Sequence, residues 1–304
     1  MLNYENNIIL DIEINNFMNV ATIEKNLRLK GFSKGSSQIL STEELKELNL
    51  LILENFRKDG SDETTFDLLG HNKRIDEIFE KIIINSEIQE VLEKTCGKNF
   101  MLWRPRLRIA KNNDRGLEIH TDSVGEMGIA FLVNNQPDAA TFFLDSSHLL
   151  PSNKQLANSN FIAWNSLKFL NIIKHFLTPA NGKSGEIYYL FHRTWHARVP
   201  ILKSNSITIF ISFFPPEAKR VDCADQNEKF CSNVTEPILK KLLSKDRYLK
   251  NINNLEKSTV PLIMKLNTID MIFKGFFHFI FLITKLLILE VVFFPVRLKR
   301  IIKK

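Results

Sequence analysis

The sequence predicts a mainly β protein with flanking helices, built on a jelly-roll core, a cupin-like double-stranded β-helix. Three observations favour this fold class: helical patterns with clear start and stop signals come first, short extended runs separated by turn residues follow residue 99, and one insertion, Pro151 to Ser184, interrupts the runs. The insertion has helical spacing over residues 166–177. The predicted strands are 101–110, 117–122, 127–134, 140–144, 186–192 and 206–214.

The composition is that of an ordinary globular protein. The 304 residues are 44% hydrophobic and 25% charged, which argues against disorder and allows a sizeable core. Three cysteines without metal-type spacing, and an N-terminus without a basic and then apolar leader, predict a reduced, cytoplasmic setting. The net charge of +7 favours an anionic partner, either nucleic acid or a membrane surface.

Four regions are predicted along the chain. Residues 1–98 form a helical scaffold packed on the core, and residues 99–216 form the jelly-roll catalytic core. Residues 217–260 form a basic helical linker, whose helix opens near Pro237. Residues 261–304 form a hydrophobic and amphipathic tail.

The first region contains recognisable helix signals. Residues 1–30, rich in Asn, predict a strand or an extended arm. Ser41 and Glu44 form a capping box that starts a helix ending near Phe56.

A second helical region is predicted from about Lys73 to Thr95. Asn85 and Ser86 mark a break within it, and Gly97 is placed to end it. No cluster of polar side chains occurs in this part of the sequence, which predicts a scaffold and not a site.

The candidate site begins at His120-Thr121-Asp122. Residues two apart on an extended segment point to the same side, so an imidazole and a carboxylate are already together. A second histidine from elsewhere would complete a 2-His-1-carboxylate set, which leaves open positions on iron. His192 and His196 are the two candidates, and the histidine that is not a ligand is expected to line the cavity. The alternative for a bare His-x-Asp is an ordinary polar pair.

Four motifs in a fixed order carry a family resemblance. They are Gly31-Phe32 followed by Ser41-Thr42-Glu43-Glu44-Leu45, then His120-Thr121-Asp122, then Ser146-Ser147-His148, and then Gly185-Glu186 with His196. Together they resemble the phytanoyl-CoA dioxygenase family of iron(II)- and 2-oxoglutarate-dependent oxygenases, over roughly residues 30–215.

The resemblance implies an enzyme that holds Fe(II) with His120, Asp122 and His196 and uses 2-oxoglutarate and O2. It makes His148 a structural or substrate-facing residue. Because halogenating relatives have a small residue in place of the carboxylate, Asp122 favours hydroxylation. Two other readings stay open: a metal-dependent cupin enzyme that does not use 2-oxoglutarate, and a non-catalytic jelly-roll module that binds a ligand at a membrane.

One position departs from the family pattern. The family places an Arg shortly after the distal histidine, where it pairs with the far carboxylate of 2-oxoglutarate. In this chain that register holds Ser206, Ile207 and Thr208. A carboxylate in a partly dry pocket needs a charge-assisted partner.

The substitute is sought among nearby cations. Arg108 is favoured because it precedes the His-x-Asp strand and shares a strand face with Arg104 and Arg106. The remaining candidates for binding 2-oxoglutarate are Arg106, Arg198, Lys203, Ser206 and Thr208. The alternative for the arginine triplet is a solvated edge or a patch for a phosphorylated substrate.

The C-terminal segment 267–304 predicts membrane attachment. Its longest run without Asp, Glu, Lys or Arg, Gly275–Thr284, is far shorter than the roughly 20 residues of a spanning helix. A narrow polar stripe, an apolar body and a basic end favour a helix lying on an anionic membrane surface. A tilted or re-entrant spanning helix and a packing or dimerisation helix are the alternatives.

This placement of the basic residues favours a membrane over nucleic acid as the partner. It predicts a peripheral or monotopic protein on the inner face of the membrane. The expected substrate is then a lipid, a lipid-linked glycan or a sugar of a surface polysaccharide.

Overall fold

The computed structural model describes residues 20–35, 39–56, 65–110, 117–122, 127–137, 141–149, 178–198, 205–218 and 220–253, together with Thr284. The predicted helix at 166–177 and the predicted tail helix lie outside these residues. No helix of the described part combines the length and the apolar character that a bilayer crossing needs.

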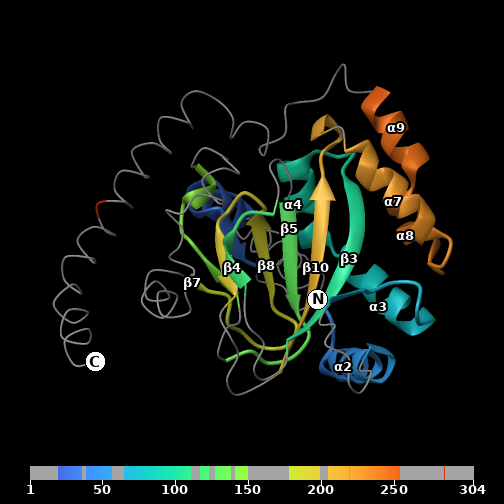
Figure 1. Ribbon diagram of the computed structural model, residues 1–304, viewed down its shortest axis with the longest axis horizontal. Helices are drawn as coiled ribbons and strands as arrows, with labels where there is room; N and C mark the ends of the chain where they lie inside the picture. Colours follow the sequence, from blue (N-terminus) through green and yellow to red (C-terminus); the bar gives the residue numbers. More distant parts are fainter. Residues whose placement is uncertain are drawn as a thin grey trace, which may run out of the picture.

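Two antiparallel sheets form a jelly-roll-like core (Figure 1). The larger sheet has the strand order β1-β8-β5-β10-β3-β2, and the smaller has the order β4-β9-β6-β7. The strands are β1 Phe32–Lys34, β2 Thr65–Asp67, β3 Met101–Ala110, β4 Leu117–His120, β5 Met127–Leu132, β6 Thr141–Phe143, β7 Thr178–Pro179, β8 Ile187–Phe191, β9 His196–Arg198 and β10 Ser206–Phe214.

All six predicted strands are present in the structure, and β3 and β10 have the predicted bounds. The very short strands β1, β2, β7 and β9 were not predicted. His192 and His196, the two candidates for the distal ligand, do not lie on one strand. Strand β8 ends at Phe191, a turn follows at residues 192–194, and β9 begins at His196.

Helices flank the larger sheet. They are α2 Thr42–Phe56, α3 Lys73–Ile83, α4 Ser86–Cys96, α7 Val221–Cys231, α8 Pro237–Leu243 and α9 Lys245–Asn253. In Figure 1, α7, α8 and α9 lie beyond β3, whereas β4 and β7 lie on the opposite side of the molecule.

The alternation of side chains along the strands separates the main core from the space between the sheets. On β8, Ile187, Tyr189 and Phe191 pack into the main core with the helices. Their neighbours Tyr188 and Leu190 belong to a smaller cluster with residues of both sheets. The inner face of the larger sheet therefore turns towards the smaller sheet.

The predicted helix signals are confirmed. The Ser41 amide donates to Glu44 Oε2 (2.9 Å), and the Glu44 amide donates to Ser41 Oγ (3.2 Å). Asn85 caps α4 through its side chain, and Gly97 ends that helix with a φ of 83°. The helix predicted near Pro237 does begin there, although it divides into α8 and α9.

The prediction of a strand or arm was wrong for residues 20–30, which form a helix. Val20, Ile23 and Leu27 have helical spacing and are buried in the core. Gly31 ends the helix with a φ of +86°, a conformation that suits glycine.

The end of this helix is fastened to the core by the Ser146-Ser147-His148 turn. The carbonyl of Arg28 contacts His148 Nε2 (3.0 Å), and the carbonyl of Leu29 accepts from Ser146 Oγ (2.7 Å). The carbonyl of Lys30 accepts from the Ser146 amide (2.8 Å). The last carbonyls of the helix, which have no partner within it, thus find one in this turn.

Candidate metal centre

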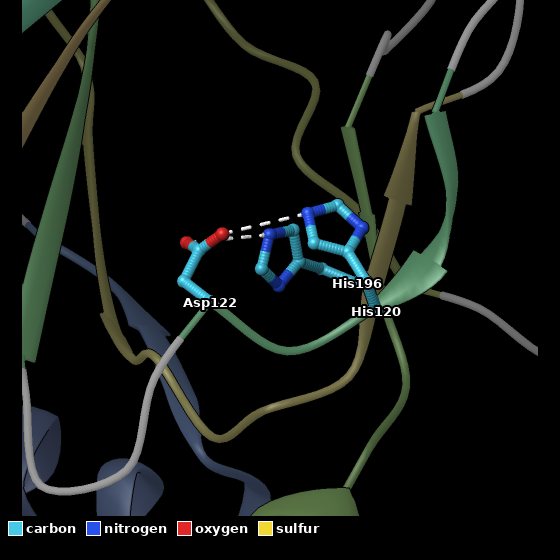
Figure 2. Close-up of side chains that lie close together, drawn as sticks. All are labelled: His120, Asp122 and His196. Atoms are coloured by element: carbon cyan, nitrogen blue, oxygen red, sulfur yellow. Dashed lines mark ion pairs between the residues drawn. The ribbon is translucent and has the colours of Figure 1, made fainter. Parts of the chain in front are cut away.

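The structure brings His120, Asp122 and His196 together (Figure 2), with one possible ligand atom of each within 4.8 Å of the others. His120 Nε2 lies 3.4 Å from Asp122 Oδ1, and His196 Nε2 lies 3.6 Å from Asp122 Oδ2. Ligand atoms about 2 Å from one ion are about 3 Å apart, so small side-chain movements would bring these atoms into a coordination sphere.

Strand pairing places the two histidines. Strands β4 and β9 are antiparallel neighbours, and His120 and His196 are directly opposite in their register. Asp122 lies just beyond the end of β4, where its amide donates to the His192 carbonyl (3.1 Å). Two strands that are distant in the sequence therefore supply the two imidazoles, and the turn after β8 holds the backbone of Asp122.

His196 is oriented through its second nitrogen. Its Nδ1 lies 2.9 Å from the carbonyl of Thr194, which fixes Nδ1 as the donor and leaves Nε2 facing Asp122. Burial lowers the pKa of His196, although Asp122 opposes this effect. The neutral imidazole that results is the form that binds a metal.

Asp122 is held as a carboxylate. Burial raises its pKa, but the hydrogen bond from His120 and the charges of His196 and His192 outweigh this effect, so the pKa lies well below its ordinary value. The side chain is 45% exposed, more than either histidine. The group thus offers two imidazole nitrogens and one carboxylate oxygen, a donor set suited to Fe(II) and to other divalent metals.

A turn on the smaller sheet positions the start of β9. Buried Ser147 accepts from the Trp195 amide (2.8 Å) and donates to the Leu144 carbonyl (2.6 Å). The Leu144 amide in turn donates to the Trp195 carbonyl (2.8 Å). Hydrogen bonds therefore hold both the amide and the carbonyl of Trp195, the residue before His196.

The metal group opens into a cavity of about 430 Å³ between the two sheets. The cavity is lined by Thr65, Trp103, Arg106, Arg108, His120, Asp122, Gly128, Ile129, Thr141, Phe143, Leu190, His192, His196, Ala197, Phe210, Ile211, Ser212 and Arg220. Its walls are largely apolar, with a few charged groups, as in small-molecule sites.

His192, the second candidate for the distal ligand, lies apart from the metal group. It is buried and lines the cavity, with Nε2 3.4 Å from Ser212 Oγ. Gly128 makes room for it, because a Cβ at this position would meet His192 Nε2 at 2.4 Å.

His148 is fully buried away from the cavity. Its ring contacts the Arg28 carbonyl and lies near Phe191, with ring centroids 5.7 Å apart. Of the two roles expected for it, this placement is that of a structural residue.

The residues predicted to bind 2-oxoglutarate divide into three groups. Arg106 and Arg108 line the cavity. Ser206 and Thr208 are buried and do not line it, and Thr208 Oγ1 accepts from Gln136 Nε2 (3.0 Å).

The third group consists of Arg198 and Lys203, whose side chains the structure does not describe. Arg198 is in β9, but its side chain lies outside the described part of the chain, as does all of Lys203.

Sequence reasoning missed Trp103 and Arg220 as lining residues. Trp103 is on the strand that carries Arg106 and Arg108, but an irregularity in the register between β3 and β10 changes which residues share a face. Arg220 follows β10 and precedes α7, and no sequence signal links it to the histidines.

No protein-family model matches the sequence, and no curated protein matches it. Among solved structures, the chain is similar to HygX from Streptomyces hygroscopicus with nickel and 2-oxoglutarate bound, with 12% identity and a TM-score of 0.50 over 64% of this chain and 86% of that one. This likeness shows a shared fold.

Two further solved structures are similar at lower TM-scores. AviO1 from Streptomyces viridochromogenes Tue57 has 16% identity and a TM-score of 0.47, over 64% of this chain and 95% of that one. The non-heme alpha-ketoglutarate-dependent epimerase SnoN has 13% identity and a TM-score of 0.48, over 65% of this chain and 81% of that one.

Proposed function

We propose that the protein is an Fe(II)- and 2-oxoglutarate-dependent dioxygenase of the phytanoyl-CoA dioxygenase-like type, acting as a hydroxylase. The observation that carries this proposal is the group of His120, Asp122 and His196 on the wall of a cavity between two sheets. HygX, which has the same fold, binds nickel and 2-oxoglutarate, and nickel is a common substitute for iron.

When bound, Fe(II) with 2-oxoglutarate and O2 supplies the oxidative decarboxylation of the keto acid and the insertion of oxygen into a C–H bond. The chain contributes the ligands and the surroundings. His120 and His196 offer neutral nitrogens, and Asp122 offers the negative charge that partly balances the ion. Phe143, whose ring centroid lies 6.4 Å from that of His196, and Leu190 form an apolar wall that excludes water from the reacting groups.

We assign the far carboxylate of 2-oxoglutarate to Arg108. The register where the resemblance expects an Arg holds Thr208, and the residue opposite Thr208 on the neighbouring strand β3 is Arg108. Arg108 lines the same cavity as the metal group. An arginine on the neighbouring strand β3 would thus bind the same carboxylate of 2-oxoglutarate. The guanidinium group suits this role because it can donate two parallel hydrogen bonds to a carboxylate.

Arg106 is the second candidate, since it also lines the cavity, and its guanidinium lies near a carboxylate. It lies 3.5 Å from Asp67 and over the ring of Trp103 at 5.8 Å.

The test is turnover that depends on both Fe(II) and 2-oxoglutarate. The full chain should release succinate when both are supplied, and His120→Ala and Asp122→Ala should abolish this release. His71→Ala is the matched control, because His71 packs against Phe56 outside the cavity. Undiminished succinate release in the two site variants would refute the assignment.

Metal binding and visible spectroscopy separate the alternatives. A cupin enzyme that does not use 2-oxoglutarate would bind metal but show no visible charge-transfer band when Fe(II) and 2-oxoglutarate are added without air. A non-catalytic module would bind no metal at these three residues.

We also propose that residues 267–304 attach the protein to an anionic membrane surface and that the substrate is a lipid, a lipid-linked glycan or a surface-polysaccharide sugar. The support is the apolar and basic pattern of the sequence, since the segment lies outside the described residues. Flotation with anionic liposomes should be lost when the chain ends at Val260. Equal flotation of both proteins would remove the tail from the proposal.

A further inference from the structure

The cavity is lined by more arginines than the binding of one 2-oxoglutarate requires. Three arginines line it, Arg106, Arg108 and Arg220, whereas Asp122 is its only acidic residue in the part of the chain that the structure describes. In the proposed function Asp122 faces the metal, and Arg108 pairs with one end of 2-oxoglutarate. Arg106 and Arg220 then remain on the wall.

These two arginines are joined by a row of rings. The Arg106 guanidinium lies 5.8 Å from the centre of the Trp103 ring, and the Trp103 and Phe214 rings are 6.0 Å apart. The Arg220 guanidinium lies 5.2 Å from the Phe214 ring. We call Arg106, Trp103, Phe214 and Arg220 the cation–aromatic row.

The row has a cavity side and a buried side. Trp103, Arg106 and Arg220 line the cavity, whereas Phe214 is fully buried behind them. A ligand in the cavity would therefore meet the Trp103 indole and the guanidinium groups of Arg106 and Arg220.

Carboxylates that do not line the cavity hold these arginines in place. Asp67 is shared, since it lies 3.4 Å from Arg104 and 3.5 Å from Arg106. Asp222 accepts two hydrogen bonds from Arg220, both of 3.0 Å. A carboxylate outside the cavity thus orients each guanidinium of the row, while the cavity wall itself carries three arginines and, in the described part of the chain, one acidic residue.

We propose that the cation–aromatic row is the substrate subsite and that the substrate carries an anionic group, a phosphate or a carboxylate, next to a ring. The inference rests on the proposed function, because it names the substrate class of the same cavity. Guanidinium groups bind phosphate and carboxylate through paired hydrogen bonds. The flat face of Trp103 suits a ring held against it.

The subsite can be tested without turnover. Nickel and 2-oxoglutarate are loaded on the full chain, and three probes of similar shape are titrated: phenyl phosphate, benzoate and benzyl alcohol. Binding is followed by calorimetry. We expect at least one of the two anions to bind tenfold or more tightly than benzyl alcohol, and the stronger anion identifies the group that the substrate carries.

Variants then assign the binding to the row. Arg220→Gln should weaken binding of the preferred anion at least fivefold, and Arg220→Lys should weaken it less. Arg74→Gln is the matched control, because Arg74 also forms a paired contact with a carboxylate, Glu47, but lies on α3 outside the cavity. Circular dichroism checks that each variant is folded.

Two results would overturn the proposal: equal binding of benzyl alcohol and both anions, or full retention of anion binding in folded Arg220→Gln and Arg220→Lys. Parallel titrations of nickel and of 2-oxoglutarate report on the proposed function separately. A wild-type chain that binds neither of them but still prefers an anion through Arg220 would contradict the dioxygenase assignment and leave the subsite standing.

Discussion

His120 and His196 lie directly opposite each other on two antiparallel strands, and their ring centroids are 4.4 Å apart. This cross-strand pairing brings residues from distant parts of the sequence to one point, beside Asp122 (Figure 2). The geometry of the metal group is therefore set by the pairing of β4 with β9.

The first prediction separates the two histidines that follow β8. His196→Ala should lower the affinity for nickel by at least about 100-fold, because it removes a ligand atom. His192→Ala should lower it by less than about threefold, because the His192 ring lies beside Ser212 and not in the metal group. Calorimetric titration of the metal-free protein measures both, and the reverse order of effects would make His192 the ligand.

The second prediction concerns the anchor for 2-oxoglutarate. Arg108→Gln should raise the dissociation constant of 2-oxoglutarate by about 10- to 100-fold, since a hydrogen bond to a charged group contributes about 1.5–3 kcal/mol. Arg104→Gln is the control, because Arg104 shares the strand but does not line the cavity. Titration of the nickel-loaded protein gives both values, and equal losses in the two variants would exclude Arg108 as the specific partner.

The third prediction uses the close approach of Gly128 to His192. Gly128→Ala should reduce the free energy of unfolding by about 1–3 kcal/mol, because the added methyl group overlaps the imidazole. In a His192→Ala background the same change should cost less, by at least about 0.5 kcal/mol. Urea unfolding of the four proteins completes the cycle, and additive effects would show that the two residues do not clash.

The fourth prediction concerns the turn that holds the start of β9. Ser147→Ala should reduce the free energy of unfolding by about 1–3 kcal/mol, because it leaves the Trp195 amide and the Leu144 carbonyl without this partner. Since Trp195 precedes His196, nickel affinity should also fall. Ser86→Ala, at an exposed position in the first turn of α4, should change neither quantity. A Ser147→Ala protein with lower stability but unchanged nickel affinity would show that the turn does not position His196.

Much of the fold could be predicted because its signals are local. The long strands show runs of extended character, and α2 and α4 begin at side chains that bond nearby backbone amides, such as Ser41, Glu44 and Asn85. The helix at residues 20–30 also has a local signal, the spacing of Val20, Ile23 and Leu27, but Asn-rich sequence before it favoured an arm.

The remaining features depend on contacts between distant residues. Strands β1, β7 and β9 have two or three residues, and pairing defines them more than propensity does. The position of Arg108 opposite Thr208 follows from the register of β3 and β10, and Arg220 reaches the cavity only because of how the chain turns after β10. The His-x-Asp motif predicts two of the three metal ligands, but the pairing of β4 with β9 is what brings His196 beside them.

The two sheets differ greatly in strand length: β3 and β10 have ten and nine residues, whereas β4 and β9 have four and three. Few ladder bonds hold the short pair, so in the metal-free protein its amide protons should exchange with deuterium well before those of the long pair. An ion shared by His120 and His196 would join β4 to β9 through their side chains. Metal loading should then slow the exchange of the amide protons of β4 and β9 and leave the exchange of those of the long strands almost unchanged.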